Sequence, residues 1–125
     1  MSTFRDLKVY QKAFKLAMDI FELTKSYPDE EKFGLTIQIR KSSRSVCSSI
    51  GEAYRKRKYP AHFVSKLTDA DTENSETQVW LDFSYECGYM NKGDYSRLMK
   101  KSEEVGKLLN HMIEYPEKYL KNADK

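Results

Sequence analysis

The fold is decided by residues 60–87, which read PAHFVSKLTDADTENSETQVWLDFSYEC. Apolar and small side chains recur there every three or four positions, the period of an α-helix with one buried face. The members of this stripe are Phe63, Leu67, Ala70, Asn74, Thr77, Leu81 and Ser84. Pro60 suits the first turn of such a helix and Gly88 suits its carboxyl end. The pattern predicts one long helix over residues 60–87.

The preceding segment predicts a second helix over residues 34–57. Its apolar positions are Leu35, Ile39, Val46, Ile50 and Ala53, and they are interleaved with Ser42, Ser43, Ser45, Ser48, Ser49 and Gly51. Serine is only a middling helix former, so propensity does not explain this run. Small side chains allow a neighbouring helix to approach closely, and this packing role is the interpretation we favour.

Two further helices are predicted on either side of this pair. The first covers residues 6–27, has a broad apolar face that includes Phe14 and Phe21, and ends before Pro28. The other covers residues 94–115 and ends before Pro116. Residues 121–125 are expected to fray. Four helices joined by short loops predict an all-α fold, an antiparallel up-down-up-down four-helix bundle formed by one domain over residues 1–125.

Composition supports long helices. The 125 residues are 39% hydrophobic and 33% charged, with only 5 glycines and 3 prolines, a composition that disfavours a many-turned β fold. No apolar run reaches the ~18 residues of a membrane span, and the first residues lack the apolar stretch of a signal peptide. Cys47 and Cys87 form no CxxC pair. The sequence therefore indicates a cytoplasmic protein with two reduced, buried thiols and no membrane contact.

The charges are unevenly distributed, although 22 basic and 19 acidic residues leave a net charge of only +3. Residues 40–58 hold seven basic side chains and one acid, whereas residues 69–86 hold six acids and no base. If the two middle helices pair about the turn near Tyr59, Glu73 and Glu76 come within reach of three of these bases. Salt bridges between the two helices that fix their register are the first interpretation.

Phosphate binding by the basic residues is the alternative interpretation. The run at residues 55–58 has fewer acids opposite it, so it is the better candidate, although four basic residues are a weak signal. The candidate nucleic-acid-binding residues are Arg40, Lys41, Arg44, Arg55, Lys56, Arg57 and Lys58.

Several stretches resemble one family. GLTIQIRK at residues 34–41 and SVCSSIGEAYRK at residues 45–56 are similar to its signature, and FRDLKVYQKA at residues 4–13 resembles its first helix. ETQVWLDF at residues 76–83 and CGYM at residues 87–90 resemble its third helix and the turn after it. The family is that of the four-helix-bundle proteins first noticed as products of intervening sequences in bacterial 23S ribosomal RNA genes.

The resemblance implies a non-enzymatic bundle that assembles into a ring-like homopentamer. It also implies kinship with the basic accessory proteins of diversity-generating retroelements, which associate with RNA or DNA and with a reverse transcriptase. The role of many members of the family is unsettled.

Catalysis finds little support in the sequence. His62 and His111 lie on different helices, no Glu-x-x-His motif occurs, and no glycine-rich phosphate loop is present, so we expect no catalytic residues, metal site or cofactor. One enzyme alternative is open. Arg57-x4-His62 has the spacing of the motif of HEPN-type ribonucleases, but Pro60 interrupts the stretch.

Four other residues are candidates for structural or interface roles: Glu52, Glu76, Trp80 and Phe83. Glu52 is the one acid in the basic segment, and we expect it to be buried and paired. Trp80 and Phe83 flank the buried stripe, where they either widen the core face or contact another subunit. Two function classes remain: an oligomeric nucleic-acid-binding module, or a structural or protein-interaction assembly whose basic patches are simply solvated.

Overall fold

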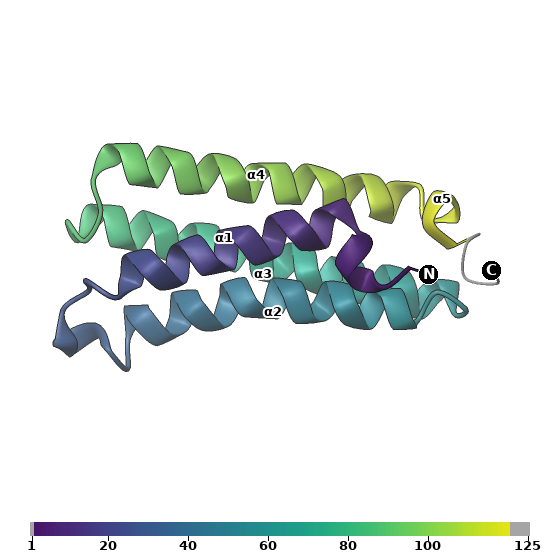
Figure 1. Ribbon diagram of the computed structural model, residues 1–125, viewed down its shortest axis with the longest axis horizontal. Coiled ribbons are helices and arrows are strands. Elements are labelled where there is room, and N and C mark those ends of the chain that lie inside the picture. Colours follow the sequence, from purple (N-terminus) through teal and green to yellow (C-terminus); the bar gives the residue numbers. More distant parts are fainter. Residues whose placement is uncertain (1, 121–125) are drawn as a thin grey trace.

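The computed structural model describes residues 2–120, so the fraying expected at residues 121–125 lies outside the described part of the chain. Four long helices dominate it: α1 (Lys8–Thr24), α2 (Leu35–Arg55), α3 (Pro60–Glu86) and α4 (Lys92–Glu114). Three short helices accompany them: η1 (Phe4–Asp6), η2 (Asp29–Glu31) and α5 (Glu117–Leu120). The predicted all-α fold with four long helices is confirmed (Figure 1).

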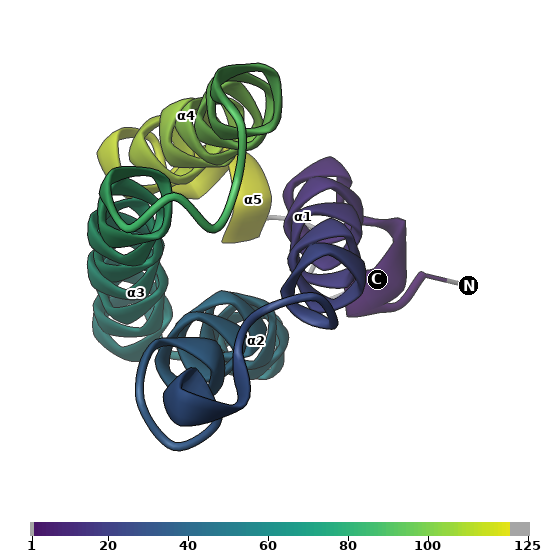
Figure 2. The ribbon, with the colours of Figure 1, turned by 90° about the vertical axis from the view of Figure 1, so that its left-hand side faces the viewer.

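The helices form a four-cornered bundle. In the end-on view of Figure 2, α1, α2, α3 and α4 follow one another around the corners. Each long helix contacts the next, and α4 returns to contact α1. Successive helices run in opposite directions because their connections are short (Figure 1). The turn between α2 and α3 therefore lies at the same end of the bundle as the amino terminus.

The core is built from the stripes that the sequence predicts. The seven side chains predicted to line α3 are its buried residues, with Leu67, Thr77 and Leu81 at 0% exposure. The five apolar positions predicted on α2 are also buried. Burial of these side chains, at ~25 cal/mol per Å² of apolar surface, is the main force that holds the helices together.

Polar contacts between small residues occupy the interior as well. Ser42 on α2 hydrogen-bonds Thr77 on α3 at 2.8 Å, and both are buried. Asn74 on α3 donates to the carbonyl oxygen of Ser102 on α4 and accepts from its hydroxyl, each at 2.9 Å. These bonds satisfy groups that would otherwise be costly to bury, and their short side chains allow close helix approach, as the serine run of α2 predicts.

The loops are fixed by specific side chains. The Glu31 carboxylate accepts a hydrogen bond from the backbone N–H of Leu35 at 3.0 Å and so caps α2. A Cβ added to Gly34 would lie 2.8 Å from Oε1 of that carboxylate, so a side chain there would have to displace the Glu31 cap. At the same end of the bundle, Gly88 adopts φ +80° after α3, the left-handed conformation predicted for a glycine that ends a helix.

Two burial expectations are wrong. Phe14 is 49% exposed, because it lies on the side of α1 that faces solvent beside α2. Cys87 is exposed because it follows the last residue of α3, whereas Cys47 is buried, and that burial raises the pKa of the Cys47 thiol to about 11. None of the helices in residues 2–120 has the length and apolar character that crossing a membrane requires.

Candidate nucleic-acid interface

The candidate basic residues form one surface along α2 and the turn after it. We call Arg40, Lys41, Arg44, Arg55, Lys56, Arg57 and Lys58 the basic strip. Arg44 and Arg55 are eleven residues apart, which is close to three helical turns, so both lie on the same side of α2. Five members of the strip are exposed, and Arg40 and Arg57 are partly exposed.

The salt bridges expected between this strip and α3 do not form. Arg40, Lys41, Arg44, Glu73 and Glu76 all belong to the described residues, and no ion pair of 4.0 Å or less joins them. No other member of the basic strip pairs with an acid of residues 2–120 either. The interpretation of the strip as a set of register-fixing salt bridges is therefore wrong.

Arg40 and Arg44 turn toward α1 instead. The Arg40 guanidinium lies 4.8 Å from the centre of the Phe21 ring, and its Nε donates to the Thr24 hydroxyl at 2.8 Å. The Arg44 guanidinium lies 5.7 Å from the same ring. An aromatic face attracts a cation without neutralising its charge, so both arginines remain available to an anion.

The acids opposite are otherwise engaged or point to solvent. Glu73 accepts a hydrogen bond from the Ser49 hydroxyl at 2.7 Å. Partial burial raises the pKa of Glu73, the Ser49 bond opposes that rise, and the neighbouring acids Asp69 and Glu76 add to it. Glu76 is exposed on the outer side of α3.

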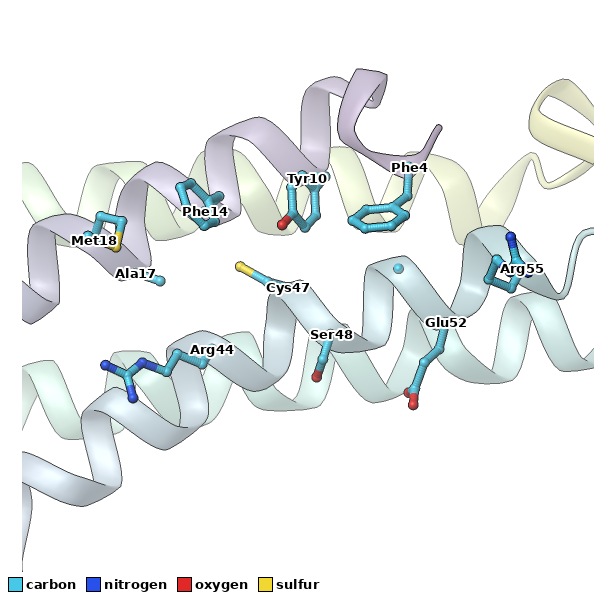
Figure 3. Close-up of a pocket in the computed structure, with 11 residues that line it drawn as sticks. Phe4, Tyr10, Phe14, Ala17, Met18, Arg44, Cys47, Ser48, Glu52 and Arg55 are labelled. Atoms are coloured by element: carbon cyan, nitrogen blue, oxygen red, sulfur yellow. The ribbon is translucent and has the colours of Figure 1, made fainter. Parts of the chain in front are cut away.

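Glu52 is paired, but it is not buried. Its side chain is 57% exposed and lies 3.3 Å from Nζ of Lys66 on α3. Figure 3 shows the Glu52 carboxylate pointing away from α1. The expectation of a buried Glu52 is wrong because this position faces α3 at the surface rather than the core. Glu52 forms its ion pair with Lys66, so Glu52 does not pair with Arg55 or Lys56.

The end of the strip near the α2–α3 turn is ordered by aromatic side chains. The Arg57 guanidinium lies 3.6 Å from the centre of the Tyr54 ring, and its Nε donates to the Tyr54 carbonyl at 3.0 Å. His62 packs edge-on against Tyr59. Within the described chain, no hydrogen bond joins Arg57 to His62, the pair that the HEPN alternative requires.

An open apolar groove lies beside the strip, between α1 and α2 (Figure 3). Its volume is about 690 Å³. Its lining from η1 and α1 consists of Phe4, Tyr10, Phe14, Ala17 and Met18. Its lining from α2 consists of Arg44, Cys47, Ser48, Gly51, Glu52 and Arg55. Phe14 and Met18 are 49% and 42% exposed there, which leaves a large apolar patch uncovered.

A second exposed row runs along the outer side of α3. Thr72, Glu76, Val79, Phe83 and Glu86 are all exposed and follow one another at helical spacings of four and three residues. We call them the outer row of α3. Val79 and Phe83 are 46% and 53% exposed, so about half of each side chain stays outside the core of a single bundle. Trp80 is partly buried beside Phe83, and its indole N–H has no hydrogen-bond partner within the described chain.

Sequence reasoning found the basic strip and, of the outer row of α3, Glu76 and Phe83, but it missed two features. The apolar groove was missed because the apolar face of α1 is broad, and helical spacing does not show which of its aromatic residues point toward solvent. Phe33, which is 83% exposed next to Lys32, was missed because it lies in a turn and belongs to no periodic pattern. Within residues 2–120, no group of three or more His, Cys, Asp or Glu side chains is placed to hold a metal ion.

Comparison with known proteins confirms the resemblance drawn over residues 4–115. The model of a family described as 23S rRNA-intervening sequence protein matches residues 5–111. Among solved structures, the chain is similar to a protein of unknown function from the S23 ribosomal protein family of Bacteroides thetaiotaomicron. The two are 32% identical with a TM-score of 0.77, over 85% of this chain and 95% of that one. No protein with a curated description matches the chain significantly.

Proposed function

Because the chain belongs to the family of 23S rRNA-intervening sequence proteins, we propose that it is a non-catalytic module that binds nucleic acid through phosphate contacts made by the basic strip. The observation that carries this proposal is the lack of acidic partners. Seven cations follow one another along α2 and its turn, and none is paired with an acid of residues 2–120. Like charges one helical turn apart repel one another, so an anionic partner stabilises this surface.

The expected mode of binding is independent of sequence. Phosphate contacts position a nucleic acid but carry no base information, and no groove-reading motif occurs in the chain. Exposed lysines and arginines in such contacts release counterions when they bind. Affinity is therefore expected to fall steeply between ~50 and ~200 mM salt.

A pair of charge reversals tests the proposal. Lys41→Glu with Lys56→Glu changes two exposed members of the strip, and we expect weaker binding of labelled RNA and DNA in fluorescence anisotropy. Lys100→Glu with Lys107→Glu makes the same change in net charge at exposed positions of α4, and we expect it to bind as the wild type does, apart from a small long-range effect. Equal loss in both variants, or no binding by the wild type at 50 mM salt, would contradict the proposal.

We further infer that the chain self-associates, with the outer row of α3 from one copy lying in the apolar groove of the next. Both surfaces have an apolar centre, and Arg44 and Arg55 of the groove can face Glu76 and Glu86 of the outer row. Glu52 also lines the groove, but it is already paired with Lys66. Glu76 and Glu86 are about 15 Å apart along α3, and Arg44 and Arg55 are about 17 Å apart along α2, from a rise of 1.5 Å per residue. This contact covers Phe14 and Phe83 and leaves the other five cations of the strip to nucleic acid.

Such a contact joins two different faces, so it is heterologous and generates a ring when the rotation closes. The five-membered ring that the resemblance implies agrees with this geometry. Phe83→Glu places a charge in the contact at an exposed position, so the fold is retained, and we expect smaller species in light scattering. Trp80→Glu is expected to act in the same direction.

The control for this experiment is Tyr115→Glu, which adds the same charge at a position 38% exposed and outside both surfaces. A mass near five times the 14.7 kDa of one chain supports the ring. A wild-type particle of 14.7 kDa at micromolar concentration would contradict self-association.

We propose no hydrolytic activity, since no convergent base, nucleophile and oxyanion donors can be named. RNA cleavage by the wild type that is abolished in His62→Ala would overturn this and favour the HEPN-like alternative. Association with a reverse transcriptase stays a prediction from the resemblance.

A further inference from the structure

A second hollow, separate from the apolar groove, lies beside the start of α2. Its volume is about 530 Å³, within the ~300–1,000 Å³ range of small-ligand sites. Its lining includes four cations, Lys32, Arg40, Lys41 and Arg44, and no acid of the described chain. Phe33 forms part of its wall, so we call it the Phe33 hollow.

Phe33 is exposed to a degree that the fold does not explain. At 83% exposure it is the most open of the large hydrophobic residues in the described chain. Isolated exposed apolar residues are ordinary on protein surfaces, but this ring lies among four cations. Nζ of Lys32 lies 5.5 Å from the centre of the ring. An aromatic face among cations is the arrangement by which proteins hold an unpaired base and its phosphates.

The turn that presents Phe33 is held in place. The Glu31 carboxylate accepts hydrogen bonds from the N–H of Leu35 and, at 2.9 Å, from the hydroxyl of Tyr89, which lies beyond α3. The backbone N–H of Lys32 and Gly34 donate to the carbonyls of Asp29 and Glu31. The aromatic ring is thus carried by an ordered backbone, so a ligand that stacks on it does not have to order the turn.

Side chains of α2 that line the hollow are also held in place. The Arg40 guanidinium is fixed by the Thr24 hydroxyl and the Phe21 ring. Thr36 is 8% exposed, and its hydroxyl oxygen has no hydrogen-bond partner in residues 2–120. Thr36 lines the hollow, but its buried hydroxyl oxygen takes no part in the proposed contacts.

We propose that the Phe33 hollow binds single-stranded nucleic acid, with one base stacked on Phe33 and the flanking phosphates held by Lys32, Arg40 and Lys41. This inference rests on the proposed function, and it adds the strandedness and the position of one base. In a duplex both faces of each base are covered by its neighbours, so only an unpaired base presents a face to the ring. RNA and DNA share this chemistry, and the experiment compares them.

The test uses anisotropy of labelled 20-mers of mixed sequence at ~50 mM salt: single-stranded RNA, single-stranded DNA and the matching DNA duplex. Phe33→Ala is expected to weaken binding of both single strands roughly 5- to 150-fold, since base–aromatic stacking is worth ~1–3 kcal/mol per base. Binding of the duplex is expected to be unchanged. Phe33→Trp keeps an aromatic face and is expected to restore the single-strand affinity. Tyr115→Ala, another exposed aromatic residue, is the control and is expected to change nothing.

Stacking also has a spectroscopic signature. In a Trp80→Phe background, Phe33→Trp supplies the one tryptophan of the chain, and single-stranded nucleic acid is expected to quench its fluorescence while the duplex does not. Equal affinity for single strands and duplex, together with no effect of Phe33→Ala, would overturn this inference while the phosphate-binding proposal stands. Absence of binding to all three oligonucleotides would overturn both. A change of oligomer mass in Phe33→Ala without loss of single-strand affinity would identify a protein contact and overturn the inference.

Discussion

Replacement of Asn74 by alanine removes the polar link between α3 and α4 at the middle of the bundle. The Asn74 amide makes two hydrogen bonds to Ser102, one to its carbonyl oxygen and one from its hydroxyl, both at 2.9 Å. Asn74 is 2% exposed and Ser102 is fully buried. Gln78 donates to the same hydroxyl at 3.0 Å and remains in the variant.

The expected cost follows from these contacts. Truncation removes two hydrogen bonds to Ser102 and leaves the proton of its buried hydroxyl without the Asn74 acceptor. A buried group left unsatisfied costs about 1–3 kcal/mol. Because Gln78 still bonds to Ser102, we expect a loss of about 2–4 kcal/mol in the free energy of unfolding, a large part of the ~5–15 kcal/mol of a typical domain.

Urea unfolding followed by circular dichroism measures this loss. The matched control is Asn110→Ala, since Asn110 is exposed on α4 and its replacement is expected to change stability by less than about 0.5 kcal/mol. Protein concentration must be equal in all samples, because self-association adds to apparent stability. If Asn74→Ala lies within 0.5 kcal/mol of the wild type with an unchanged urea slope, the buried polar link does not stabilise the bundle.

Three further changes have expected outcomes. The pKa of Glu73 is raised in the folded state, so ionisation of Glu73 lowers the stability of the protein as pH rises. Glu73→Gln should therefore raise the Tm at pH 7. A gain in Tm that persists at pH 4 would contradict this reasoning. Burial alone would raise the pKa of Asp19, but hydrogen bonds from Lys101 and Lys15 outweigh it and lower that pKa. Asp19→Asn should cost about 1–2 kcal/mol at pH 7, less as pH falls through the pKa of the folded state, and an equal cost at all pH values would refute the link. Gly88→Ala should cost about 1–2 kcal/mol in urea unfolding, because φ is +80° there, and an unchanged midpoint would contradict this.

The fold could be predicted because the helical period decides which positions of a helix face the core. The stripe of α3 includes Asn74, Thr77 and Ser84, which are polar, yet their spacing placed them inside together with Phe63 and Leu81. Proline and glycine positions fixed the helix ends to within a few residues. The first helix ends three residues earlier than predicted because the chain after Thr24 tightens into successive three-residue turns.

The direction of long side chains could not be predicted in the same way. Arg40 lies on α2 opposite the acidic segment of α3, but its guanidinium contacts α1, where it donates to the Thr24 hydroxyl and packs on the Phe21 ring. Helical spacing places the Cα atom, whereas the several rotatable bonds of arginine leave a choice between two neighbouring helices. Counting charges along α2 and α3 therefore predicted ion pairs between these two helices. In the structure, Arg40 and Arg44 contact residues of α1 instead.

The surface features could be predicted only in part, for a similar reason. A helix with more apolar surface than its neighbours can cover has a surplus of aromatic residues in its sequence. The sequence does not show which of these residues point toward solvent. Phe14 belongs to that surplus and lines the apolar groove, while Ala13 and Leu16 beside it enter the core. The spacing of Arg44 and Arg55 along the groove, and of Glu76 and Glu86 along the outer row of α3, could be compared only once both helices were placed.

Phosphate binding by the basic strip is tested by the salt dependence of affinity. Each phosphate neutralised on a single strand contributes about −0.7 to the slope of log K against log salt concentration. We expect the slope of wild-type binding to single-stranded RNA to become shallower by about 1.4 when Lys41→Gln and Lys56→Gln remove two contacts. Lys100→Gln with Lys107→Gln is expected to leave the slope unchanged. A slope near zero in the wild type, or the same slope in both double variants, would contradict the assignment of the basic strip to phosphate binding.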